Sequence, residues 1–116
     1  MSLFKSFTLT VKRTLPGFYV DGKWQEAAPT TFEIQTSWQP ANGKDLEILE
    51  EGKRVSGIYK IYPGQRMFVA DPKTQQKADI VVGPDGYEYE VITVGDWQNN
   101  LINHYKCMVM RVKEGI

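Results

Sequence analysis

Apolar and polar side chains alternate along short stretches of this chain, which is the pattern of half-buried β-strands. Two stretches show the alternation most clearly, residues 7–12 and residues 32–38. In the first, Phe7, Leu9 and Val11 fall on one face. Three further stretches are rich in β-branched and aromatic residues and alternate less regularly: residues 55–62, 87–94 and 104–112.

Turn-forming residues separate these stretches at short intervals. Residues 17–24 read as a small hairpin around Asp21-Gly22, because an Asp-Gly pair supplies the positive φ angles of tight turns. The strongest hairpin signal is the turn at residues 83–86, which joins the apolar residues 80–82 to residues 87–91.

Helix is almost absent from the pattern. Only residues 45–52 and 96–102 have the composition of a helical turn, and both are too short to form a free-standing helix. Strands spaced by turns predict an all-β fold, a small antiparallel β-barrel or sandwich of about seven to eight strands with one or two short helical turns. No repeat or linker divides the chain, so residues 1–116 are expected to form one domain.

Composition excludes several classes of protein. With 41% hydrophobic and 24% charged residues, the chain has the make-up of a folded domain rather than a disordered one. Fourteen basic residues balance fourteen acidic ones, which argues against a cationic nucleic-acid binder. No apolar run approaches the length of a membrane span. A single cysteine and the lack of a signal-peptide pattern favour synthesis in a reducing cytoplasm.

Charge is balanced in total but segregated along the chain. Residues 1–13 carry only basic charges, residues 63–77 are mostly basic, and residues 78–96 carry only acidic ones. One interpretation is two oppositely charged faces suited to head-to-tail contact between copies. The other is solvated surface, since strand alternation scatters charges that are close in sequence.

The residues that catalysis or metal binding would need are few. His104 and Cys107 are three apart in an expected strand and therefore point to opposite faces. We interpret them as a hydrogen-bonded strand-end histidine and a buried, inert thiol. Glu88 and Glu90 share a face but follow a hairpin turn, where carboxylates usually face solvent. We therefore expect no catalytic residue, no metal site and no cofactor, and not an enzyme.

Residues 63–77 form the longest polar stretch between expected strands. Pro63-Gly64 and Asp71-Pro72 oppose a continuous strand. A loop of this length in a small barrel is usually functional or mobile, and the alternative is a surface loop in which residues 67–69 form a short edge strand. Shortening residues 65–76 is expected to leave the barrel folded, because loop length costs little stability.

The C-terminal third carries a resemblance. Residues 86–97 (GYEYEVITVGDW), followed by Asn103-His104-Tyr105-Lys106, resemble a pattern found in neck proteins of tailed bacteriophages, the head-closure (stopper) and head–tail joining proteins. Weaker similarity covers residues 31–35, 38–40 and 46–54, so that the resemblance spans roughly residues 30–112.

The motif residues have a structural interpretation of their own. We expect Tyr89 and Val91 to face the core from one strand and Tyr105 to pair across from that same strand. Gly95 is expected to end the strand, Asp96 to cap the short turn that follows, and Trp97 to cover a barrel end where the chain crosses over. The residues assigned to this structural motif are Tyr89, Val91, Trp97, His104 and Tyr105.

The resemblance implies a virion structural protein that joins the portal to the tail and closes the DNA-filled head. The implied partners are a portal-side connector or adaptor protein, a tail terminator or tail-tube protein, copies of itself in a ring, and packaged DNA in the channel without sequence specificity. The resemblance implies no membrane partner. The protein would be made in the host cytoplasm and reside in the virion neck.

The similarity also assigns the long loop to subunit contact or to the channel, through Arg66, Met67, Phe68, Lys73 and Lys77. Isolated subunits are expected to be monomers or weak oligomers. The alternative function is a small β-barrel that binds single-stranded nucleic acid through exposed aromatic residues.

Overall fold

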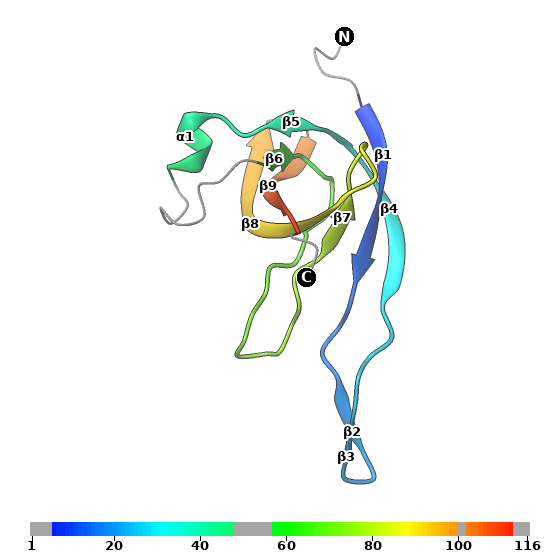
Figure 1. Cartoon of the computed structure of the whole chain (residues 1–116). Coiled ribbons are helices and arrows are strands. Elements are labelled where there is room, and N and C mark those ends of the chain that lie inside the picture. The colour runs from blue at the N-terminus through cyan, green and yellow to red at the C-terminus, as the bar shows by residue number, and fades with distance from the viewer. Residues whose placement is uncertain (1–5, 48–56, 100–101, 113–116) are drawn as a thin grey trace.

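The computed structural model describes residues 6–47, 57–99 and 102–112, and within these residues the fold is all-β (Figure 1). One helical turn, α1 (Gly43–Leu46), interrupts the strands. The strands are β1 (Ser6–Arg13), β2 (Phe18–Val20), β3 (Lys23–Gln25), β4 (Thr30–Ser37), β5 (Gln39–Pro40), β6 (Ile58–Ile61), β7 (Ile80–Val82), β8 (Glu88–Asn99) and β9 (Ile102–Arg111).

Seven of these strands form one sheet in the order β4-β1-β7-β8-β9-β6-β5, and every pairing in it is antiparallel. The sheet curls into a half-barrel (Figure 1). The remaining two strands, β2 and β3, pair only with each other. The all-β antiparallel fold predicted from the alternation and the turn spacing is therefore confirmed.

The two edges of the curled sheet are made by one continuous piece of chain. Strand β4 pairs with β1 at one edge, strand β5 pairs with β6 at the other, and only Trp38 separates β4 from β5. The backbone N–H of Tyr62, just after β6, also donates to Thr36 Oγ1 of β4 at 2.7 Å. The chain thus draws the two edges toward each other, which limits the exposed edge that a sheet would otherwise present.

Both predicted hairpins form at the expected turns. Strands β2 and β3 are joined by Asp21 and Gly22, which both have positive φ angles, 51° and 79°. Strands β7 and β8 are joined by residues 83–87, where Gly86 N–H donates to the Gly83 carbonyl oxygen at 2.9 Å.

The two predicted helical turns fare differently. Helix α1 starts at Gly43, two residues before the predicted stretch 45–52, whose residues 48–52 lie outside the described part of the chain. The second prediction is wrong, because residues 96–99 continue β8 and pair with β9. Gly95 likewise pairs with Lys106 instead of ending the strand, so Asp96 caps no turn. The long ladder to β9 supplies backbone partners that a single helical turn cannot match.

The core lies inside the curl of the sheet. Inward-pointing residues of β1, β4, β6, β7, β8 and β9, together with one residue of the loop before β7, form one apolar cluster: Leu9, Val11, Ile34, Ile61, Met67, Val81, Tyr89, Val91, Cys107 and Val109. A second, smaller cluster of Ile58 and Met108 lies on the opposite face of β6 and β9. A shift of register at Ile92, between the Val91–Val109 and Thr93–Met108 pairs, adds a residue to β8, as in a β-bulge that bends a strand.

Candidate interaction surface

Residues 14–29 form an arm that projects from the barrel and carries the β2–β3 hairpin at its end (Figure 1). The arm contributes to the elongated shape of the molecule, whose principal extents are 54 × 34 × 26 Å. All six residues of β2 and β3 are exposed. The hairpin at the end of the arm is thus not covered by the rest of the described chain.

Large apolar side chains are exposed on both faces of the arm. Tyr19 lies opposite Trp24 on one face, with ring centroids 5.0 Å apart in an edge-to-face arrangement, and Tyr19 is 72% exposed. Phe18 and Val20, one residue to either side of Tyr19, point to the other face and are also exposed. An apolar ribbon that is exposed on both sides is a candidate surface for contact with another molecule.

The arm holds its aromatic residues in a defined position. A Cβ atom on Gly17 would lie 2.5 Å from a carbon of the Trp24 ring, so that the indole packs directly on the Gly17 backbone. The indole N–H of Trp24 donates to Glu26 Oε1 at 3.3 Å. These contacts fix the Trp24 ring against the hairpin, so that less side-chain conformational entropy would be lost when a partner binds.

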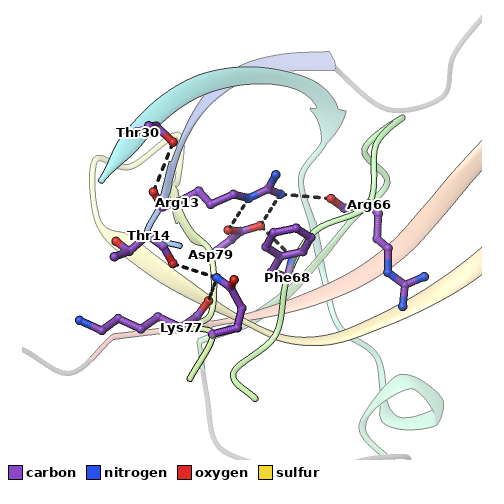
Figure 2. Close-up of polar contacts among 8 residues, drawn as sticks. Arg13, Thr14, Thr30, Arg66, Phe68, Lys77 and Asp79 are labelled. Carbon is purple, nitrogen blue, oxygen red and sulfur yellow. Dashed lines mark hydrogen bonds and ion pairs between the residues drawn. The ribbon is translucent and has the colours of Figure 1, made fainter. Parts of the chain in front are cut away.

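An ion pair anchors the base of the arm. Arg13, at the end of β1, donates from Nε to Asp79 Oδ1 at 2.9 Å and from Nη2 to Asp79 Oδ2 at 2.8 Å (Figure 2). The side chain of Asp79 is 0% exposed, and that of Arg13 is 17% exposed. Asp79 Oδ2 also accepts from the backbone N–H of Phe68 at 2.8 Å. A buried carboxylate is tolerated here because both of its oxygens have donors.

Aromatic rings enclose the guanidinium of this pair. The Arg13 guanidinium carbon lies 3.9 Å from the centre of the Phe68 ring and 4.7 Å from the centre of the Phe32 ring. Arg13 Nη2 also donates to the Arg66 carbonyl oxygen at 3.2 Å. The cluster therefore joins three segments that are far apart in sequence: β1, β4 and the loop before β7.

Sequence reasoning missed Arg13 and Asp79 as a pair, although a signal was present. Arg13 continues the inward phase of Leu9 and Val11, and Asp79 shares the phase of the buried Val81. Oppositely charged residues at inward-facing positions of two strands indicate a buried ion pair if the strands are neighbours. The sequence alone does not show that β1 and β7 are neighbours.

The 63–77 loop packs on the barrel over part of its length. Pro63 is fully buried, and its carbonyl oxygen accepts from the Tyr105 N–H at 3.1 Å. Met67 is 1% exposed and belongs to the main core, so it presents almost no surface of its own. Phe68 is half-buried beneath Arg13. Residues 67–69 form no strand; the loop's one ladder contact is an isolated bridge between Asp71 and Gln76.

The three basic residues that were assigned to this loop lie on its surface. Arg66, Lys73 and Lys77 are all exposed. The Lys77 ammonium lies 3.7 Å from Glu26 Oε2, which links the loop to the arm through an exposed ion pair. The structure thus leaves charged side chains on the loop surface, while Met67 and Phe68 hold the loop to the barrel.

An open depression of about 360 Å³ lies between the loop, the base of the arm and β8. Its apolar lining comes from Pro16, Met67, Phe68, Val69 and Val94. The polar lining residues are Arg66, Asp71, Thr74 and Gln76. The depression is large enough for one or two side chains of a partner.

The structural motif lies where its alternation predicts, as far as the structure describes it. Tyr89 and Val91 are buried in the core, and Tyr105 is half-buried against it and pairs with Asp96 of β8. Trp97 pairs with His104 across the β8–β9 ladder, and their side chains lie outside the described part. Trp97 therefore belongs to a strand rather than to a crossover.

Tyr89 belongs to an aromatic cluster. Its ring meets those of Trp38 and Tyr59 edge-on, with centroids 4.8 Å and 5.5 Å away, and Trp38 stacks on Tyr59 at 4.7 Å. The Tyr89 hydroxyl donates to Asp85 Oδ2 at 2.7 Å. Burial, together with this hydrogen bond, raises the pKa of Tyr89 well above its ordinary value. The residue is a core element with a satisfied hydroxyl.

Cys107 is completely buried, and burial raises the pKa of its thiol from the ordinary 9.0 to about 12. The thiol therefore stays protonated at neutral pH, and a protonated thiol is a poor nucleophile and a poor metal ligand. Among the residues that the structure describes, no group of three or more His, Cys, Asp or Glu side chains is placed to hold a metal ion.

The charged segments of the sequence meet across neighbouring strands. Arg13 of the basic N-terminal segment pairs with Asp79, and Lys12 pairs with Glu88. Two acidic residues of the 78–96 segment are thus neutralised by β1, which lies beside β7 in the sheet.

Comparison of the sequence with protein-family models and with curated proteins identifies no relative. No protein-family model matches the chain, and no curated protein matches it significantly. Within the described residues no helix has both the length and the hydropathy needed to cross a membrane.

Proposed function

We propose that this protein is a structural component of the neck of a tailed bacteriophage, which joins the portal side to the tail and closes the DNA-filled head. The sequence pattern over roughly residues 30–112 supports this proposal, and the antiparallel barrel-like fold is compatible with it. The observation that carries it is the projecting arm, because its exposed aromatic residues fit a protein whose work is contact with other proteins.

The cost of exposing these side chains supports the same proposal. Fully burying a large apolar side chain stabilises a protein by about 1.5–3 kcal/mol, and the arm forgoes part of this at Phe18, Tyr19 and Trp24. Tyr and Trp are also the residue types that contribute most at protein–protein interfaces. A neck protein must bind a connector, a tail protein and further copies of itself, and a protruding arm extends the surface available to them.

Binding of single-stranded nucleic acid is the alternative, and the charges of the arm argue against it. The arm carries Lys23 against Asp21 and Glu26, so its aromatic residues lie in a slightly acidic setting. Contact with a phosphate backbone needs basic residues beside the stacking rings. Titration with a labelled oligonucleotide at two salt concentrations separates the functions, since tight, salt-dependent binding would favour the alternative.

A genetic experiment tests the neck proposal. A nonsense codon early in the gene is placed in the phage genome, and the phage is grown in a host that does not suppress it. We expect separate tails and heads that fail to retain their DNA, with normal particles restored by a plasmid copy of the gene. Complete, infectious particles without the plasmid copy would contradict the proposal, as would arrest before DNA packaging begins.

A further inference from the structure

We propose that the arm of one copy inserts the Tyr19–Trp24 face of its hairpin into the depression beside the 63–77 loop of a second copy. This inference rests on the proposed function for its setting, a ring of copies in the neck. It goes further by naming the two surfaces that meet in that ring.

The arm is built to be covered by a partner. A two-stranded hairpin is at best marginally stable alone in water, and this one pairs with no other strand among the described residues. Among the described residues, Tyr19 is the most exposed of the large apolar side chains. Pro16 at the base of the arm lines the depression, while the hairpin points away from the barrel (Figure 1), so the tip cannot reach the depression of its own chain.

The depression has the chemistry to receive an aromatic pair. Its apolar wall includes Phe68, Val69 and Val94, which suits the ring faces. Asp71 and Thr74 in the lining offer polar groups to the Tyr19 hydroxyl. Charge is complementary at the tip of the hairpin, where the exposed Asp21 can face the exposed Lys73 of the loop, whereas Glu26 and Lys77 already pair with each other within the chain.

The contact joins different surfaces of the two copies, so it is head-to-tail. Such contacts continue from copy to copy and close into a ring when the rotation allows it. Two aromatic side chains bury about 150–250 Å² each, which is well below the ~1,200 Å² of stable interfaces. The free protein should therefore associate weakly and form complete rings only on a connector.

Sedimentation velocity with two complementary variants tests the contact. Tyr19→Ser damages the arm and keeps the depression, whereas Val69→Glu damages the depression and keeps the arm. At concentrations up to about 1 mM, where weak contacts are detectable, the wild-type protein should grow beyond dimers. Each variant alone should stay monomeric, and their equimolar mixture should stop at dimers, because only one intact arm–depression pair exists for each two chains.

Tyr87→Ser is the matched control, since it removes another exposed tyrosine outside the arm and should associate as the wild type does. Circular dichroism confirms that each variant is folded. The inference would be overturned if the wild-type protein stays monomeric or stops at dimers. It would also be overturned if either variant alone associates as the wild type does. If this experiment rejects the arm–depression contact while the nonsense mutant shows the expected neck defect, only the inference fails and the proposed function is retained.

Discussion

Arg13 and Asp79 form a two-bond ion pair that joins the base of the arm to the start of β7, with the Asp79 side chain fully buried. The same carboxylate accepts from Phe68 N–H, so one anchor holds both the arm and the 63–77 loop. The two surfaces that we propose to meet in neighbouring copies are thereby fixed relative to each other within one chain.

The first prediction concerns this anchor. Asp79→Ala should lower the free energy of unfolding by about 3–5 kcal/mol, because it leaves the Arg13 guanidinium and the Phe68 N–H without their acceptor. Lys12→Ala removes an ion pair with Glu88 that is about half exposed, and should cost at most about 1 kcal/mol. Urea denaturation measures both. Equal losses in the two variants would refute the anchoring role.

The second prediction concerns the 63–77 loop. Met67→Ala should destabilise the protein by about 2–5 kcal/mol, because it opens a cavity in the main core. Lys73→Ala, in the same loop but exposed, should change the stability by less than about 0.5 kcal/mol. Replacing residues 65–76 by a Gly-Ser linker should also destabilise the barrel, contrary to the expectation from loop length alone. Thermal unfolding that is unchanged by the linker would show that Met67 adds nothing to the core.

The third prediction concerns the aromatic cluster. A Cβ atom on Gly83 would lie 2.8 Å from the Tyr89 ring and 3.1 Å from the Trp38 ring. Gly83→Ala should therefore force the cluster apart and cost about 1–3 kcal/mol. Gly64→Ala adds a Cβ in open space and should be close to neutral. Near-ultraviolet circular dichroism should change only for Gly83→Ala, and an unchanged spectrum would contradict this packing.

The fourth prediction concerns alkaline pH. The pKa of Cys107 is about 12 in the folded protein against an ordinary 9.0, so above pH 9 the unfolded chain releases this proton while the folded chain keeps it. The free energy of unfolding should therefore fall as the pH rises through this range, and be undiminished below it. The free energy of unfolding of the Cys107→Ala variant should fall less steeply with pH between about pH 8 and about pH 10.5. A slope identical to that of the wild type would mean that the thiol is not protected.

Local patterns predicted much of the fold. Asp21-Gly22 and the turn at 83–86 specified two hairpins, because turn residues act through their own φ angles. Alternation placed Tyr89, Val91 and Cys107 in the core. Residues 96–102 were misread as a helical turn, because their strand is formed by pairing with β9 and not by local preference.

The candidate site was harder to predict, because it depends on which strands are neighbours. The Arg13–Asp79 pair follows from the position of β1 beside β7, a relationship between residues 66 positions apart. The hairpin of the arm was predicted, but its projection from the barrel was not, since local sequence does not state what covers a hairpin. The sequence pattern places Met67 in a polar loop, and its burial depends on the same long-range packing.

Cryo-electron microscopy of purified virions tests the central claim most directly. The account predicts density for this barrel as a ring between the portal and the tail, with each arm seated against the 63–77 loop of the next copy. Absence of the chain from purified virions, or its location in the capsid shell or the tail fibres, would contradict the account.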